Sequence, residues 1–413
     1  MSKLSLNELN KSTLCAQMWF GCVVKSNGGA GICCEIGEML PEEYNVLTKE
    51  VCEFVESPVF ITARQEMISG KEPPQCWRCF DREKHGTSSL RQTLNTFYIL
   101  NNGYFDTNKI EIQNVEIVFG DLCQLSCVMC HPLRSRKVID SFNHIVKTDF
   151  RDTYKLDNHM LANNVLCDTS WTENKEVWDN ILPQLLTTKR LFLNGGEPLL
   201  ATYHNYLLEY LINNNVAKNI ELIYSTNLLL LNDTHLKLWS NFKTVNVAIS
   251  VDDLHERNNF IRYPTTWEKL EEKINQIYQL KFVENTLPNV NFSIWCAVNM
   301  LSFFYLTEFL TYFHKTFPLL PIQGLRGIQT PVFLNPNVMP LSIRTPVIDE
   351  LLFFIETNKY NMHLKNDLNF FTGADENILY MKDGIRFLEM TAEYRNINIH
   401  TRFEKSFNRI SMI

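Results

Sequence analysis

The sequence predicts an α/β protein: a parallel sheet or barrel, preceded by a small cysteine-rich α+β module and followed by helices. From about residue 113, short apolar runs alternate with helix-like stretches, as is typical of parallel α/β folds. Each of the first four runs ends in residues suited to chemistry, which are three cysteines, Gly-Gly-Glu, Ser-Thr-Asn and Ser-Val-Asp-Asp. In parallel folds the functional groups lie at the carboxyl ends of the strands, so this regularity supports both the fold and a site.

The small N-terminal module is expected to contain a hairpin and helices. Residues 17–25 and 30–36 read as strands joined by a turn at 26–29, and 47–67 reads as helical with an interruption at Pro58. The later strands are expected at 115–119, 190–193, 220–224, 245–249, 290–298 and 322–333. The helices between them are expected at 203–213, 231–239 and 266–282, and C-terminal helices at 347–358 and 383–394. These patterns predict three domains, at 1–112, 113–340 and 341–413.

Composition and charge restrict the class of protein. Of 413 residues, 45% are hydrophobic and 21% charged, as in globular proteins with a sizeable core. The formal charge of −7 argues against a nucleic-acid partner. We expect no signal peptide and no membrane association, because no apolar run approaches about 20 residues. The sequence therefore predicts a cytoplasmic protein, in which the twelve cysteines stay reduced and the clustered ones serve as metal ligands or catalytic groups.

A compact cysteine motif follows the first strand of the α/β region. Cys123, Cys127 and Cys130 supply three thiolates within eight residues. Thiolates hold iron–sulfur clusters, and a cubane with three protein ligands keeps one iron open to a small molecule. The alternatives are a zinc site completed by His131, or cysteines that are merely buried.

This Cys-x3-Cys-x2-Cys motif, with Gly195-Gly196-Glu197 after the second strand, resembles the radical SAM superfamily. The resemblance implies a partial (β/α)6 TIM-type barrel as the core. It also implies that the three cysteines bind a 4Fe–4S cluster whose open iron is chelated by S-adenosylmethionine. Reductive cleavage then yields a 5′-deoxyadenosyl radical that abstracts hydrogen from a substrate, and the protein orients the reactants and excludes water.

The resemblance also implies a pocket for S-adenosylmethionine. An arginine fork suits its carboxylate, for which Arg257 is the alternative to Arg262. Met129 departs from the family pattern, because many members carry an aromatic residue there. Taken singly, the glycines could be a turn, the polar residues a helix cap and the arginine a surface residue. The pocket residues are Gly195, Gly196, Glu197, Ser225, Asn227, Ser250, Asp252 and Arg262.

A second cysteine group lies in the N-terminal module. A hairpin together with a Cys-x2-Cys turn can present four thiolates to one metal centre. Adjacent strand residues face opposite ways, so only one of Cys33 and Cys34 should be a ligand, while Cys22 stays open. The segment resembles SPASM/twitch auxiliary-cluster modules, here placed before the barrel. It implies a second 4Fe–4S cluster, with a structural zinc as the alternative. The ligand set is Cys15, Cys33, Cys76 and Cys79.

The remaining cysteines, Cys52, Cys167 and Cys296, are expected to be small buried core residues. The whole set predicts a radical SAM enzyme of the oxidoreductase or maturase type. Its substrate would be a peptide or protein side chain that is oxidised or crosslinked, with oxidation or epimerisation of a small metabolite as the alternative. A flavodoxin or ferredoxin would supply electrons. A non-enzymatic iron–sulfur or zinc module for interaction or redox sensing is the alternative of another class.

Overall fold

The computed structural model describes residues 3–36, 40–84, 86, 88–132, 134–149, 168–359, 363–373 and 376–411. The chain forms two compact units. Unit 1 comprises residues 1–120, 167–224 and 233–245, and unit 2 comprises residues 121–166, 225–232 and 246–413. The three-domain division expected from the sequence stays a prediction. Cys167 lies outside the described residues.

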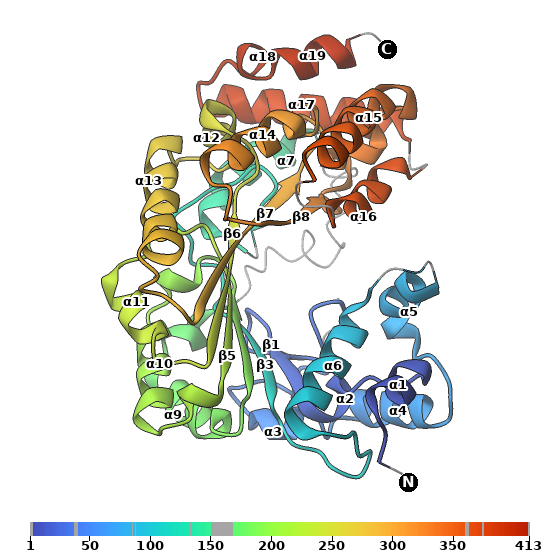
Figure 1. The fold of residues 1–413 in the computed structure, drawn as a ribbon, viewed down its shortest axis with the longest axis vertical. Helices are drawn as coiled ribbons and strands as arrows, with labels where there is room; N and C mark the ends of the chain where they lie inside the picture. The colour runs from blue at the N-terminus through green and yellow to red at the C-terminus, as the bar shows by residue number, and fades with distance from the viewer. Residues whose placement is uncertain are drawn as a thin grey trace. The chain divides into compact units, whose positions relative to one another are not determined.

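The strands form one sheet in the order β2-β1-β3-β4-β5-β6-β7-β8. The β1–β2 pair is antiparallel, whereas β1–β3, β3–β4, β4–β5 and β7–β8 are parallel. All six strands expected after residue 113 are present and are neighbours in chain order, which confirms the α/β prediction (Figure 1). The strands are β1 Gly21–Val24, β2 Ala30–Gly31, β3 Asn114–Val118, β4 Arg190–Asn194, β5 Glu221–Thr226, β6 Thr244–Ser250, β7 Val290–Val298 and β8 Ile322–Gly327.

Two helices of unit 1 begin at serine residues that cap the helix N-terminus. Ser57 caps a helix that has Pro58 at its first position, and Ser89 forms a capping box with Gln92. The helices are α1 Leu6–Lys11, α2 Gln17–Phe20, α3 Val51–Phe54, α4 Pro58–Ile68, α5 Trp77–Lys84, α6 Leu90–Asn102, α9 Lys175–Ile181, α10 His204–Asn213 and α11 Asp233–Trp239.

Unit 2 contains the helical C-terminal part of the chain, as expected. Its last helices, drawn in orange and red, lie beside one another (Figure 1). None of the described helices combines the length and apolar character needed to cross a bilayer. The helices of this unit are α7 Ile139–Asp149, α12 His255–Ile261, α13 Trp267–Tyr278, α14 Leu306–Thr316, α15 Leu341–Asn358, α16 Leu364–Leu368, α17 Ile378–Tyr394, α18 Ile399–Arg402 and α19 Glu404–Ile410.

Three sequence expectations were wrong in detail. Residues 17–20 were expected to belong to a strand but form the helical turn α2. In so short an apolar run, periodicity does not distinguish a helix from a strand. The return strand ends at Gly31, and the backbone then turns through Cys33 and Cys34. The last strand ends at Gly327, six residues earlier than expected, before the proline-containing segment at 328–331.

Candidate functional site

The three cysteines of the first motif lie in unit 2, in the cluster loop, which we define as residues 121–130. The loop is anchored through its backbone to the segment that follows α12. The Ser126 amide donates to the Tyr263 carbonyl at 2.6 Å, and the Val128 amide to the Ile261 carbonyl at 2.8 Å. Residues 261–263 therefore fix the middle of the loop, between the first and third cysteines of the motif.

The thiols of the cluster loop are close enough to influence one another. Burial, and then the charges of Cys127 and Cys123, raise the pKa of the Cys130 thiol. Burial also raises the pKa of Cys127. Such thiols ionise when a positively charged metal group stabilises the thiolates. The donor set therefore fits an iron–sulfur group.

A single metal ion would require several ligand side chains to converge on one point. In the described part of the chain, no group of three or more Cys, His, Asp or Glu side chains converges as one metal ion requires. A cluster of several irons spaces its cysteine sulfurs further apart than one ion does, so the same observation is compatible with a cluster.

Asn227 connects the end of β5 to the cluster loop. Its Oδ1 accepts from Nε2 of Gln124 at 2.9 Å and from the Leu229 amide at 3.2 Å. Asn227 is buried, whereas Ser225 is exposed at the end of the same strand. Of these two expected pocket residues, the structure therefore places Asn227 directly against the cysteine motif.

Asp252 and Arg262 pair with each other. Their Oδ2 and Nε atoms are 2.7 Å apart, and Oδ1 of Asp252 accepts from the Ala297 amide at 2.8 Å. Burial lowers the pKa of Arg262, but the negative charges of Asp252 and Cys127 outweigh it and raise the pKa above its ordinary value. The arginine therefore stays charged beside the cluster loop, and Asp252 orients it. Ser250, at the end of β6, is half-buried, and its expected contact with ribose stays a prediction.

Arg257, the alternative to Arg262, has other partners. Its Nε donates to Asp253 at 2.9 Å and its Nη2 to Glu308 at 2.8 Å. The guanidinium also lies 3.9 Å from the centre of the Tyr305 ring. These contacts occupy Arg257 in a network of its own and favour Arg262 for a ligand carboxylate.

The Gly-Gly-Glu motif lies in unit 1, just after β4. Gly195 has φ +130°, and a Cβ there would lie 2.6 Å from the Phe119 backbone nitrogen, so only glycine fits. The Glu197 carboxylate is buried and accepts from the Leu199 amide at 3.2 Å, which caps the short helix that follows. The structure thus gives these residues local packing roles, and their contact with S-adenosylmethionine stays a prediction.

The four N-terminal cysteines of the expected ligand set line one pocket in unit 1. Burial raises the pKa of each thiol, to about 12 for Cys76, and neighbouring cysteines of the set raise it further for Cys15, Cys33 and Cys76. The group is brought together from three chain segments, as the sequence suggested. Soft thiolate donors at one place fit an iron–sulfur centre, which spaces its cysteine sulfurs further apart than a single zinc ion does.

The other cysteines lie outside this pocket. Cys34 is exposed, and the Glu116 carboxylate of β3 acts on its thiol, which therefore lies toward β3. Burial and then Cys52 raise the pKa of Cys22 to about 12. Cys296 is buried, as expected. Cys52 is exposed on α3, where its thiol donates to Glu50, so its assignment to the core was wrong.

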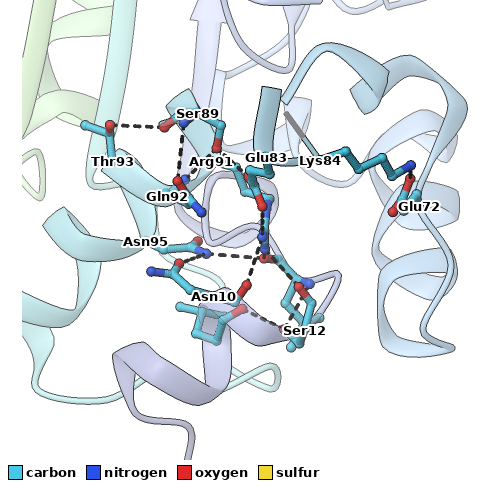
Figure 2. Close-up of polar contacts among 12 residues, drawn as sticks. Asn10, Ser12, Glu72, Glu83, Lys84, Ser89, Arg91, Gln92, Thr93 and Asn95 are labelled. Carbon is cyan, nitrogen blue, oxygen red and sulfur yellow. Dashed lines mark hydrogen bonds and ion pairs between the residues drawn. The ribbon is translucent and has the colours of Figure 1, made fainter. Parts of the chain in front are cut away.

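Arg91, which the sequence did not single out, fixes the segment that precedes Cys15. Its guanidinium donates to the backbone carbonyls of Asn10, Ser12 and Leu14 at 2.7–3.0 Å, and its Nε to the Glu83 carboxylate at 3.0 Å (Figure 2). Glu83 lies on α5, which also carries Cys79. One buried cation thereby holds two of the cysteine-bearing segments together.

Replacing Arg91 by leucine is expected to destabilise the protein by about 3–5 kcal/mol, because three backbone carbonyls lose their donor and the half-buried Glu83 carboxylate loses its cation. Burial raises the pKa of Glu83, but hydrogen bonds from Arg91 and Ser89 outweigh it and leave it below its ordinary value. The pair therefore stabilises the fold above the unfolded pKa of about 4.3, and its contribution is lost as pH falls through the folded value. Urea unfolding at pH 7 and at pH 3 measures both effects.

The matched control is Arg82→Leu, which removes an exposed ion pair with Glu35 and should cost less than about 1 kcal/mol. Equal losses for the two variants at pH 7 would contradict the special role of Arg91.

Comparisons with known proteins add only distant likenesses. No protein-family model matches the chain, and no curated protein matches it. Among solved structures, a histidine-tagged form of anSMEcpe with bound AdoMet is 19% identical with a TM-score of 0.37, and the match covers 46% of this chain and 51% of that chain. Native anSMEcpe with bound AdoMet and the Cp18Cys peptide is 18% identical with a TM-score of 0.38, covering 61% and 62%.

Streptococcus suis SuiB bound to S-adenosylmethionine is 10% identical with a TM-score of 0.36, and the match covers 82% of this chain and 70% of that chain. The chain thus spans between about half and two thirds of the length of the two anSMEcpe structures. Likenesses of this size do not establish what this protein binds or does, so its chemistry has to be argued from its own residues.

Proposed function

We propose that the protein is a radical SAM enzyme with a second, auxiliary metal centre. The observation that carries the proposal is the cluster loop itself. Cys123, Cys127 and Cys130 are close enough to alter one another's ionisation, and the buried cation Arg262 lies beside them. Three thiolates provide an incomplete ligand set for a cubane, and an arginine beside the open side suits a ligand that carries a carboxylate.

The site residues of unit 2 would then have the following roles. The three cysteines would hold a 4Fe–4S cluster, which would supply the electron for cleavage of S-adenosylmethionine to a hydrogen-abstracting radical. Arg262, oriented by Asp252, would pair with the ligand carboxylate. Asn227 keeps the loop in register with β5 through Gln124.

The pocket of Cys15, Cys33, Cys76 and Cys79 would hold a second 4Fe–4S cluster. Four thiolates complete the ligand set of a cubane, so this centre would have no iron left open for S-adenosylmethionine. It would instead take an electron from a substrate radical or anchor the substrate. Together with the resemblance to SPASM/twitch modules, this favours a peptide or protein side chain as the substrate, oxidised or crosslinked, with a ferredoxin or flavodoxin as the electron donor.

The wild-type chain, reconstituted anaerobically with iron and sulfide, is expected to hold about eight irons and to convert S-adenosylmethionine to 5′-deoxyadenosine and methionine when reduced with dithionite. Iron, acid-labile sulfide and chromatography of the nucleoside product measure this. Protein that binds iron but leaves S-adenosylmethionine intact would contradict the enzymatic proposal. Protein that binds zinc and no iron would point to a structural module.

A further inference from the structure

We propose that Arg395, the residue that follows α17, is a positioning residue for the cluster loop. Its guanidinium joins the loop to the end of α12 through two hydrogen bonds. Its positive charge makes reduction of the metal group held by the loop more favourable. The part that concerns reduction rests on the proposed function, whereas the anchoring concerns the chain alone.

The anchoring is visible in two hydrogen bonds from one side chain. Nη1 of Arg395 donates to the Phe260 carbonyl at 2.6 Å, and Nη2 donates to the Ser126 carbonyl. The guanidinium also lies 4.7 Å from the centre of the Tyr263 ring. The amide of Arg395 continues the last turn of α17 by donating to Thr391 at 3.1 Å. The end of α17 therefore holds the guanidinium in a fixed position.

These bonds join the same two segments that the backbone already pairs. The Ser126 amide donates to Tyr263 and the Val128 amide to Ile261, while Arg395 bridges the Ser126 and Phe260 carbonyls. The planar guanidinium can serve two acceptors at once, which a lysine ammonium does less well because it lacks a rigid fork. Arg395 thus reinforces the pairing that fixes the loop between its cysteines.

The guanidinium of Arg395 lies beside the cysteines of the cluster loop. Arg395 lines a pocket together with Cys127 and Cys130. Burial lowers the pKa of Arg395 to about 10, so the side chain remains cationic at neutral pH. In the described ranges, no carboxylate lies within ion-pair distance of it. A cation with no carboxylate partner among the described residues, placed beside the thiolates, favours the added negative charge of a reduced cluster.

The test compares Arg395→Gln, which removes the charge, with Arg395→Lys, which keeps the charge but loses the fork. Arg402→Gln is the matched control, because Arg402 donates to the Glu256 carbonyl of α12 at 3.4 Å and has no contact with the loop. Hydrogen exchange of the loop amides is measured on the full metal-free chain. Both Arg395 variants are expected to exchange about tenfold faster there, as for loss of a charge-assisted hydrogen bond, and the control is expected to exchange as wild type does.

The second readout is the midpoint potential of the reconstituted cluster loop centre. Arg395→Gln is expected to make reduction about tenfold less favourable, a shift of about 59 mV for one electron, and Arg395→Lys to restore most of it. Wild-type exchange in both Arg395 variants would overturn the anchoring, and an unchanged potential in Arg395→Gln would overturn the charge role. In either case wild-type iron and cleavage would leave the proposed function standing. A wild-type protein that binds no iron at the cluster loop would instead overturn the proposed function. Hydrogen exchange of the metal-free chain would still show whether Arg395 anchors the loop.

Discussion

Replacing Cys127 by alanine is expected to abolish formation of 5′-deoxyadenosine and to lower the iron content from about eight to about four per chain. Cys127 is the central ligand of the proposed cluster, and its thiol feels the charges of Arg262, Asp252 and Arg395. A cubane left with two protein ligands has no anchored open iron to chelate S-adenosylmethionine. Iron and sulfide analysis with an assay of the nucleoside product measures the effect.

The control for this variant is Cys52→Ala, which removes an exposed thiol on α3 and should change neither quantity. The variant with alanine at all three positions of the cluster loop should match Cys127→Ala in iron content. Full iron content and cleavage in Cys127→Ala would mean that the cluster loop is not the site of cleavage.

Replacing Cys79 by alanine is expected to have the complementary effect, with loss of about four irons while 5′-deoxyadenosine is still formed. Cys79 lies in the pocket that also contains Cys15, Cys33 and Cys76, and none of these belongs to the cluster loop. Cleavage of S-adenosylmethionine needs only the open cluster, so loss of the second centre should spare it. The same two assays measure the outcome.

Cys34→Ala provides the matched control, because Cys34 is adjacent to Cys33 in sequence but its thiol lies toward Glu116. It should retain about eight irons. If Cys79→Ala also emptied the cluster loop, the division into two independent metal centres would be wrong.

The parts of the fold that the sequence predicted well are those set by local pattern. The apolar run at β3 is short and buried, and the longer β7 alternates buried with more exposed residues, so each appears within a residue of the expected position. Residues 17–20 were assigned wrongly because a run of three apolar residues after Gln17 fits either a helical turn or a strand. The end of β8 was missed because apolar residues recur after Gly327, at Ile328, Val332 and Phe333, although no strand continues there.

The candidate site divides in the same way. Cysteines carry their chemistry in their identity and spacing, and the four N-terminal cysteines were grouped from the sequence as the structure groups them. Arg91 and Arg395 were missed because they donate to backbone carbonyls far away in the chain, and any residue type supplies such a carbonyl. The basic residue at the end of α17 was the one available signal, and it reads equally well as a favourable charge at a helix terminus.

The cysteine pocket of unit 1 draws on residues as far apart as Cys15 and Cys79, which are 64 positions apart in the chain. A metal group bound by both would act as a covalent staple across a long loop. In the chain-entropy model, a crosslink of this span stabilises the fold by roughly 4 kcal/mol, chiefly by restricting the unfolded chain. The second centre would then stabilise the fold of the N-terminal module as well as carry electrons. Loss of its iron on exposure to oxygen would destabilise that module.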